Sequence, residues 1–525
     1  MTTASNPTRI FTVGTLAFAA LLTACGGGGG DGGTGPAPVT RASVDKETIQ
    51  SIQGDAVDGA PGRGYVHVCP GLNDDGRPRN LLIVVRGFAP QDTDREPAAG
   101  ELDSTCDAQG NGNDHHTLVV RYRNGADLIQ RNAGFVRAVI EWAIDRYELT
   151  AADRIALQGI SMGGVVTRYA LQSMEAAGRP HLVDLWLSVD APQRGAYIPI
   201  GMQFLADLYK DRGGAQALAV ADTPAARQML THHYRQGAST QTWTADHKRL
   251  YVDELNGTLG GFPKAAGLRR VGISSGRLGE ALQDPKPGQR YVAGRLQVFS
   301  GSVPVSYRQE NAFCSASVSL NLPIVSTLVL EAFPLGLQAN QKSLVARSNV
   351  ETKVAGYDVD TQVSDLTSYI NARVSITGLL GLCETFAATA KAAIVKQAVD
   401  AAVAAGEKEA APYTATYEKS FEAYGDGIQS EGAPGGRSNY IDQLRDALTQ
   451  AGFSSEAGVT GGGTHMFVSV ASALNIATPT GRMDATALQA SSPFDQVYVE
   501  SASNLDHLSS TSGYFAKEVD ELFKR

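Results

Sequence analysis

Short apolar runs alternate with helix-like segments through the first half of the chain. Continuous apolar stretches typical of strands buried on both faces occupy residues 81–85, 117–120, 154–158 and 183–189. Apolar residues recur at helical spacing between 126 and 146, and a second helix is expected from 165 to about 177. This alternation predicts an α/β fold with a mostly parallel sheet flanked by helices.

The second half of the chain interrupts this pattern twice. Segments 198–209 and 223–234 predict amphipathic helices and, with the residues around them (about 196–265), a helical lid; residues 268–274 then resume the sheet. A large inserted subdomain is expected over 280–460, with alternating β-like stretches such as 296–300 and an Ala-rich helix at 385–408. A last strand at 494–499 and a last helix at 514–523 complete the core, which spans 46–279 and 461–525.

The N-terminal residues have the pattern of a targeting segment. Arg9 precedes an apolar stretch, 10–22, that is too short to span a membrane. Leu22-Thr23-Ala24-Cys25 resembles the lipobox of bacterial lipoproteins, which implies removal of 1–24 and acylation of Cys25. The alternative is an ordinary secretory peptide cleaved after Ala24. Residues 25–45 predict a flexible tether, and the glycines after Cys25 resemble the outer-membrane sorting pattern, so we expect an exported protein anchored by lipid to the outer membrane.

Charge argues against one class of partner, and the cysteine content predicts disulfides. The chain has 525 residues, 19% of them charged, and its net charge of −9 without a basic block argues against nucleic acid. Four cysteines remain besides Cys25, and this even number in an exported chain predicts two disulfides, Cys69–Cys106 and Cys314–Cys383. The metal-binding spacings C-x-x-C and H-E-x-x-H are missing from the sequence, so we expect neither a metal nor a cofactor.

Gly159-Ile160-Ser161-Met162-Gly163 lies between a predicted strand and a predicted helix. In this context G-x-S-x-G indicates a nucleophile elbow, a tight turn that presents the serine hydroxyl at the top of a parallel sheet. The Met162 amide would lie at the N-terminus of the helix, where it stabilises a developing oxyanion.

A serine nucleophile needs a histidine base. His507 follows the last predicted strand and precedes the last helix, which is the position expected for the base. His465 is the alternative and otherwise lines the substrate pocket or the core. His232 and His233 are expected to be solvated in the lid.

The acid is less well defined by the sequence. Residues 274–277, where the acid would normally follow the sheet strand, contain no carboxylate. Asp190 ends the preceding strand and is the first candidate, although an aspartate before Ala-Pro can also simply form a turn. Asp495 and Asp506 are the alternatives.

Residues 81–277 and 430–520 resemble bacterial α/β-hydrolases of the lipase/esterase type. Arg86-Gly87-Phe88 and Pro192-Gln193-Arg194-Gly195 stand where that family has H-G-φ and P-H-x-G motifs, each with a histidine replaced. Since the implied oxyanion donors are the backbone amides of Phe88 and Met162, neither replacement removes them. Segments 190–196, 433–436 and 467–474 resemble an exported subgroup of the same superfamily.

Together these features predict an enzyme with an α/β-hydrolase fold that cleaves carboxylic esters through an acyl-enzyme. Five apolar lid positions suit an acyl-chain substrate: Ile198, Ile200, Met202, Phe204 and Leu205. The alternatives are an acyltransferase that uses the same triad on a cell-envelope acceptor, and a non-catalytic binding lipoprotein with a hydrolase scaffold.

Overall fold

The computed structural model describes most of the predicted core and scattered strands of the insertion. The described residues are 46–71, 80–92, 94–108, 115–198, 203, 206, 218–233, 235, 243–277, 295–297, 302–310, 314–323, 343–353, 356–369, 371–378, 408–411, 414–424, 435–439, 454–455, 465–476, 485–500, 503–507 and 512–524. The predicted signal segment, the tether and Cys25 lie outside them.

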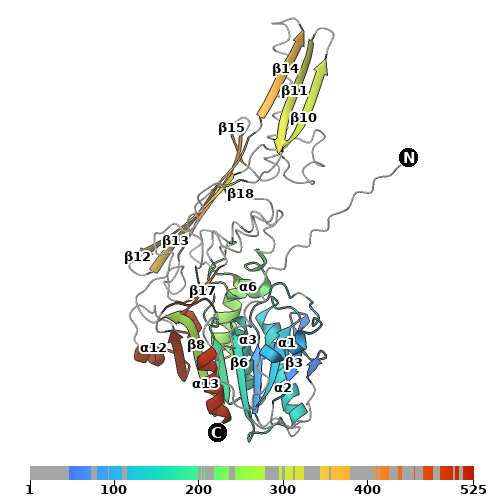
Figure 1. Cartoon of the computed structure of the whole chain (residues 1–525). Coiled ribbons are helices and arrows are strands. Elements are labelled where there is room, and N and C mark those ends of the chain that lie inside the picture. Colours follow the sequence, from blue (N-terminus) through green and yellow to red (C-terminus); the bar gives the residue numbers. More distant parts are fainter. Residues whose placement is uncertain are drawn as a thin grey trace, which may run out of the picture.

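A nine-stranded sheet forms the core, in the order β1-β3-β5-β4-β6-β7-β8-β20, with β2 paired to β3 (Figure 1). Strands β4 to β8 and β20 run parallel, whereas β1, β2 and β3 are antiparallel additions at one edge. The bounds are β1 Glu47–Ile49, β2 Gln53–Val57, β3 Ala60–Cys69, β4 Asn80–Val85, β5 His116–Tyr122, β6 Arg154–Ile160, β7 Leu185–Val189, β8 Arg269–Arg277 and β20 Gln496–Glu500. The predicted α/β class with a mostly parallel sheet is confirmed.

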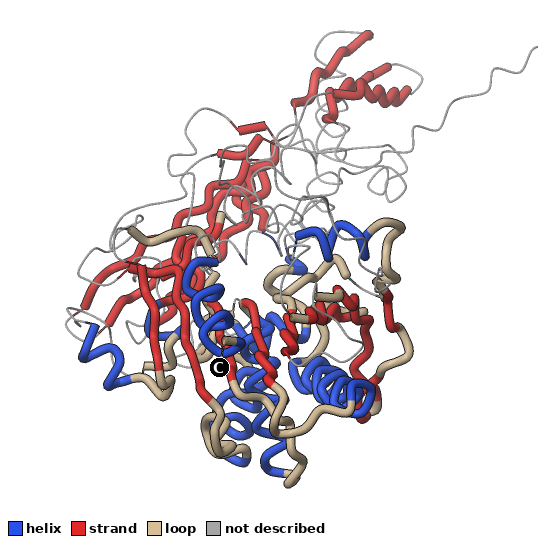
Figure 2. Tube along the Cα trace, turned by 60° about the horizontal axis from the view of Figure 1, so that its bottom comes forward, coloured by secondary structure: helices blue, strands red, loops and turns tan. Residues whose placement is uncertain are grey.

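Helices bury both faces of this sheet (Figures 1 and 2). In β4, Leu81, Ile83 and Val85 pack with α2 (Ile129–Tyr147) and α3 (Met162–Ala176), whereas Leu82 and Val84 belong to the cluster that α13 (Ser512–Phe523) joins. Successive residues of a strand point to opposite faces, so a continuous apolar run is what a strand covered on both sides requires.

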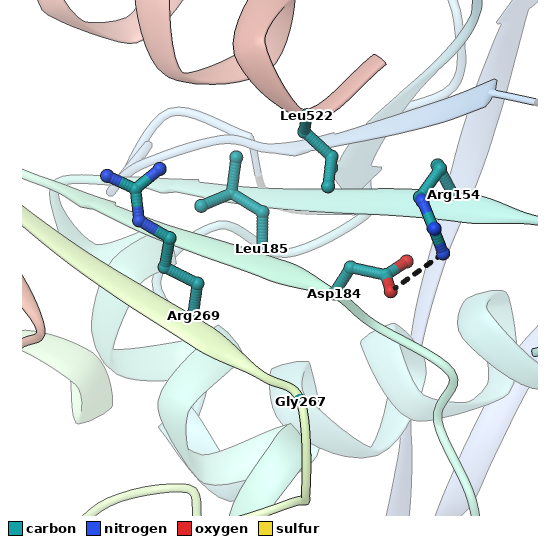
Figure 3. A pocket seen from close by; sticks show the side chains of 6 residues that line it. All are labelled: Arg154, Asp184, Leu185, Gly267, Arg269 and Leu522. Carbon is teal, nitrogen blue, oxygen red and sulfur yellow. Dashed lines mark ion pairs between the residues drawn. The ribbon is translucent and has the colours of Figure 1, made fainter. Parts of the chain in front are cut away.

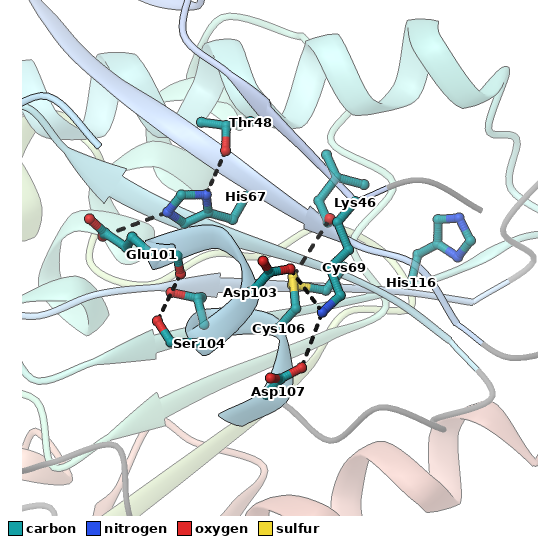
Figure 4. The surroundings of a disulfide bond; sticks show 12 residues. Lys46, Thr48, His67, Cys69, Glu101, Asp103, Ser104, Cys106, Asp107 and His116 are labelled. Atoms are coloured by element: carbon teal, nitrogen blue, oxygen red, sulfur yellow. Dashed lines mark hydrogen bonds and ion pairs between the residues drawn. A yellow bond between two sulfur atoms is a disulfide. The ribbon is translucent and has the colours of Figure 1, made fainter. Parts of the chain in front are cut away.

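A disulfide joins the edge of the sheet to helix α1 (Glu101–Ala108), as Figure 4 shows. Cys69 is the last residue of β3 and Cys106 lies in α1, with their Cα atoms 5.2 Å apart. Both side chains are buried. The predicted Cys69–Cys106 pairing is therefore confirmed, whereas Cys383 of the second predicted pair lies outside the described residues.

The described part of the predicted lid contains short helical elements. They are α6 (Pro224–Met229), α7 (Ala245–His247) and the π-helix η4 (Lys248–Thr258). Thr223 caps α6, because its hydroxyl accepts a hydrogen bond from the Ala226 amide. The predicted helix over 198–209 lies mostly outside the described residues.

The described strands within the range of the predicted insertion pair among themselves. One sheet has the order β10-β11-β14 and another the order β15-β16-β13-β12-β9-β18. Their bounds are β9 Arg295–Gln297, β10 Ser302–Glu310, β11 Cys314–Pro323, β12 Ser343–Lys353, β13 Gly356–Tyr369, β14 Asn371–Gly378, β15 Lys408–Ala411, β16 Thr414–Tyr424 and β18 Ser454–Ser455. The predicted Ala-rich helix lies outside the described residues, except that Lys408 begins β15.

After most of the insertion, the chain rejoins the core as a two-stranded pair of β17 (Gly435–Ser438) and β19 (His465–Ser469). Two short helices, α11 (Val470–Ala473) and α12 (Ala485–Ser491), lead from β19 to β20.

Among the residues that the structure describes, none of the helices is both long and apolar enough to cross a membrane.

Candidate active site

The predicted elbow is the turn between β6 and α3. Ser161 has φ 54° and ψ −123°, a conformation that L-residues rarely adopt and that neighbouring contacts must hold. The Ser161 amide donates to the Val189 carbonyl at 2.8 Å, which ties the elbow to the end of β7. A Cβ at Gly159 would lie 2.4 Å from Thr167 Oγ1, and one at Gly163 would lie 2.4 Å from the Val85 carbonyl oxygen. Both motif glycines are thus required by close packing.

The structure brings the three leading candidates into one hydrogen-bonded chain. Ser161 Oγ lies 2.8 Å from His507 Nε2, and His507 Nδ1 donates to Asp190 Oδ2 at 2.7 Å. The nucleophile candidate follows β6, the acid candidate follows β7 and the histidine follows β20. Serine, acid and histidine therefore occur in the chain order of an α/β-hydrolase, at the carboxyl ends of parallel strands.

Asp190 is fully buried, and both its backbone amide and its carboxylate form hydrogen bonds with β8. Its amide donates to the Ile273 carbonyl at 2.7 Å, and its Oδ1 accepts from the Ser275 amide at 3.0 Å. A carboxylate fixed in this way can orient the imidazole of His507 and stabilise its protonated form.

The competing carboxylates are engaged elsewhere. Asp495 binds the guanidinium of Arg270 at 2.6 Å, and the hydrogen bonds from Arg270 hold the pKa of this carboxyl below its usual range. Asp506 forms an ion pair with Arg437 at 3.0 Å. Neither of these carboxylates holds His507 in the structure.

His465 lies in β19 and is fully buried, and burial lowers its pKa to about 3. The prediction that His232 and His233 are solvated is wrong, because they are only 3% and 1% exposed. His233 Nε2 donates to the Ala221 carbonyl at 3.1 Å, and His232 Nδ1 lies 3.0 Å from Thr231 Oγ1. Their polar neighbours in sequence suggested a surface, but His233 packs against Ala221 and Asp222, and the ring of His232 lies 5.2 Å from that of Tyr197.

The loop after β4 passes directly over the elbow. A Cβ at Gly87 would lie only 3.0 Å from Ser161 Cβ, so glycine allows this approach. The loop is fixed by a hydrogen bond from the Ala89 amide to the Gly125 carbonyl and by an ion pair of Arg86 with Asp92 at 3.6 Å. Phe88 follows Gly87 here, and Met162 begins α3, where the first amides of a helix have no intrahelical acceptor.

Strand β17 supports the histidine and was not recognised from the sequence. The His507 amide donates to the Arg437 carbonyl at 2.7 Å, and a Cβ at Gly436 would lie 2.2 Å from Asp190 Oδ2. Gly436 therefore packs against the acid while Arg437 holds the base. These residues lie within the 280–460 range assigned to the insertion, and the Gly435-Gly436 pair was the one available signal.

A buried arginine on the elbow helix fixes the chain after the acid. Arg168 is fully buried, and Nη1 donates to the carbonyl of Gln193 at 3.3 Å. Gln193 in turn donates to Ser188 Oγ in β7 at 2.9 Å. Burial lowers the pKa of Arg168 to about 9. Because this network depends on contacts distant in sequence, the sequence alone did not reveal it.

A cavity of about 180 Å³ lies near the amino ends of the parallel strands β6, β7 and β8 (Figure 3). It is lined by Arg154, Asp184, Leu185, Gly267, Arg269 and Leu522. Arg154 and Asp184 form an ion pair at 3.6 Å. Leu522 belongs to α13, and the other five residues lie at or just before the amino ends of β6, β7 and β8, so the cavity is separate from the Ser161 site at the carboxyl ends.

Within the described part of the chain, no group of three or more histidine, cysteine, aspartate or glutamate side chains is placed to hold a metal ion.

Comparison with solved structures gives similarities at low sequence identity. The chain is similar to brefeldin A esterase, described as a bacterial homologue of human hormone sensitive lipase, with 15% identity and a TM-score of 0.25 over 46% of this chain and 63% of that one. It is also similar to esterase Est22, with 12% identity and a TM-score of 0.26 over 44% of this chain and 62% of that one. A Pyrobaculum calidifontis esterase has 15% identity and a TM-score of 0.26 over 45% of this chain and 66% of that one. The chain thus spans less than two thirds of each. No protein-family model matches the chain, and neither does any curated protein.

Proposed function

We propose that this protein is a serine hydrolase that cleaves carboxylic esters through an acyl-enzyme. The observation that carries the proposal is the continuous hydrogen-bonded chain from Ser161 Oγ through His507 to Asp190. A serine hydroxyl gains nucleophilicity when a histidine accepts its proton, and a carboxylate holds that histidine in the productive tautomer.

In the first half-reaction, Ser161 Oγ attacks the ester carbonyl while His507 Nε2 takes the hydroxyl proton. The amides of Phe88 and Met162 donate to the oxyanion that forms. Asp190 stabilises the imidazolium, which then gives its proton to the departing alkoxide, so that an alcohol leaves. Water repeats these steps on the acyl-enzyme and releases the carboxylic acid.

Apolar side chains near the proposed site support an acyl-chain substrate. The ring of Phe467 lies against that of His507, with centroids 5.1 Å apart. The Phe467 carbonyl accepts from the Tyr197 amide at 2.8 Å, and this contact fixes the start of the proposed lid beside the site. Ile198, the next residue, is buried. Apolar side chains at this place favour the acyl part of an ester.

Activity on p-nitrophenyl esters of graded chain length, measured for the parent and for Ser161→Ala, tests the proposal. We expect Ser161→Ala to lose at least about a thousandfold in kcat, and a fluorophosphonate probe to label Ser161 in the parent. A folded Ser161→Ala protein that keeps most of the activity contradicts the mechanism. If the probe labels Ser161 but the esters are not hydrolysed, the result points instead to transfer of the acyl group onto another acceptor.

We also propose that the protein is exported and anchored through lipid on Cys25. Besides the lipobox-like sequence, the Cys69–Cys106 disulfide supports export, because disulfides persist in oxidising compartments.

A further inference from the structure

The segment that carries His507 lies between the end of β8 and β17. The Leu505 amide donates to the Ser275 carbonyl at 3.0 Å on one side. On the other side, the Arg437 amide donates to the Leu505 carbonyl at 2.9 Å, and Arg437 in turn accepts from the His507 amide at 2.7 Å. Residues 503–507 thus lie like a short strand between two flanking segments, the end of β8 and β17.

One side-chain atom joins these two flanking segments. Asn504 Oδ1 accepts hydrogen bonds from the Arg277 amide at 2.8 Å and from the Gly435 amide at 3.2 Å. Arg277 is the last residue of β8 and Gly435 is the first of β17. An amide oxygen has two lone pairs, so it can accept both bonds at once.

The two segments that Asn504 joins also hold the acid. Ser275 donates to Asp190 Oδ1, and Gly436 packs against Asp190 Oδ2. A shift of either segment would therefore change the position of Asp190 and of His507 together. Misplacement of a reacting group by about 1 Å can cost about a hundredfold in rate.

We propose that Asn504 is a positioning residue for His507, which fixes the base and the acid by holding β8 and β17 together. This inference rests on the proposed function. Asn504 acts through the backbone of its neighbours and does not touch the reacting atoms, so its loss should lower kcat and leave KM little changed.

The test compares Asn504→Leu, which removes the acceptor, with Asn504→Asp, which keeps an oxygen in the same place. Gln489→Leu is the matched control, because the Gln489 side-chain amide also bonds two backbone groups, those of Val497 and Phe494, at the opposite end of β20. kcat is measured per active site titrated with a fluorophosphonate, so only competent molecules count. We expect Asn504→Leu to lose roughly 10- to 100-fold in kcat with KM nearly unchanged, and Asn504→Asp to recover most of it.

If Asn504→Leu folds poorly, Asn504→Ser, whose shorter side chain cannot span both amides, replaces it in the same comparison. A titrated kcat within about twofold of the parent for the Leu or Ser variant overturns the positioning role while the Ser161-dependent activity still stands. A loss of equal size in Asn504→Asp or in Gln489→Leu also overturns it. If the parent has no Ser161-dependent activity, the proposed function itself fails and this inference falls with it.

Discussion

Two of the three triad candidates occupy strained backbone positions. Ser161 has φ 54° and Asp190 has φ 42°, and neither is a glycine. Such conformations cost about 1–3 kcal/mol each and persist where the surroundings hold them. The amide of each residue donates to the next strand of the sheet, Ser161 to Val189 at the end of β7 and Asp190 to Ile273 in the middle of β8. The same bonds that hold the strain therefore aim both side chains at His507.

The carboxylates can be ranked by substitution. Asp190→Asn should lower kcat by at least about a hundredfold with the fold preserved, because the imidazole loses its charge-stabilising partner. Asp495→Asn should leave kcat almost unchanged, since Asp495 binds Arg270 away from the site. Steady-state kinetics with circular dichroism of both variants checks this. A larger kcat loss in Asp495→Asn would show that Asp190 is only a turn residue.

The two candidate bases, His507 and His465, can also be ranked by substitution. His507→Ala removes the group that hydrogen-bonds Ser161 and should cost about as much as Ser161→Ala, at least about a thousandfold in kcat. His465→Ala should cost far less per folded molecule, because His465 is buried in β19. The reverse order of kcat per folded molecule, with folding measured by circular dichroism, would contradict the assignment of the base.

Candidate site residues could be predicted from the sequence where the signal is local or follows chain order. Ser161 is defined by five consecutive residues, and His507 by its place after the last strand. Asp190 could only be ranked, because three carboxylates fitted the order and long-range bonds decide among them. The support from Asn504, Arg437 and Arg168 could not be predicted, since each acts across large separations in sequence.

At the scale of elements, helix α1 is attached to the sheet by covalent and ionic links. Besides the disulfide, Glu101 binds Arg121 at 2.8 Å, and Lys46 bonds Asp103 and Asp107 on the same helix (Figure 4). Burial alone would raise the pKa of Glu101, but hydrogen bonds from Arg95 and the Ala98 amide, with the charge of Arg121, lower it to about 2.

Opening the disulfide should destabilise the core without altering the triad. Replacing both Cys69 and Cys106 by Ser releases a loop constraint and should lower the free energy of unfolding by about 2–4 kcal/mol. Urea unfolding measures this loss, and kcat at low temperature should stay near that of the parent. A variant as stable as the parent would mean that the ionic links alone hold α1.

The elements that could be predicted are those with long apolar runs. The parallel strands and α2, α3 and α13 agree with the predicted positions to within a few residues. The antiparallel edge strands β1 and β2 and the short β17 were not predicted, because they are short and half polar and owe their form to pairing with neighbours.

At the scale of the molecule, buried neutral histidines link folding to pH. Burial lowers the pKa of His233 to about 4 and those of His247 and His465 to about 3. In the unfolded chain these groups titrate near 6.5. The unfolded state thus binds more protons below that pH, so the stability that these groups contribute is complete above 6.5 and is lost as the pH falls.

We therefore expect acid destabilisation that begins before the carboxylates titrate. Each buried histidine should add a slope of about 1.4 kcal/mol per pH unit between about pH 6 and 4.5. Urea unfolding at several pH values measures the slope, and His247→Gln should reduce it by about one histidine's share. An unchanged slope in His247→Gln would show that His247 is not the neutral buried group inferred here.

The proposed lipid anchor is also tested on the whole chain. Cys25→Ser should prevent acylation and release the protein from membranes, since a single residue carries the proposed lipid. Envelope fractionation of cells that express parent and variant decides this, with Ser161→Ala as a control that should stay with the membranes. Equal partitioning of Cys25→Ser with membranes would contradict the anchor.

The close contact between the two core segments that flank the predicted insertion has a consequence for how the chain could be altered. A Cβ at Gly276 would lie 2.6 Å from the Cα of Gly435, so the two ends of the intervening segment touch. When the ends of a loop already meet, its length matters little, since each doubling adds only about 0.6 kcal/mol of closure entropy. We therefore expect that residues 278–434 can be shortened, lengthened or exchanged for a foreign domain at small cost to the core, with a two- to four-residue turn joining the ends, although exchange also removes β9, the partner of β18. The junction thus lies beside the candidate active site and offers a place where a segment could be grafted without rebuilding the sheet.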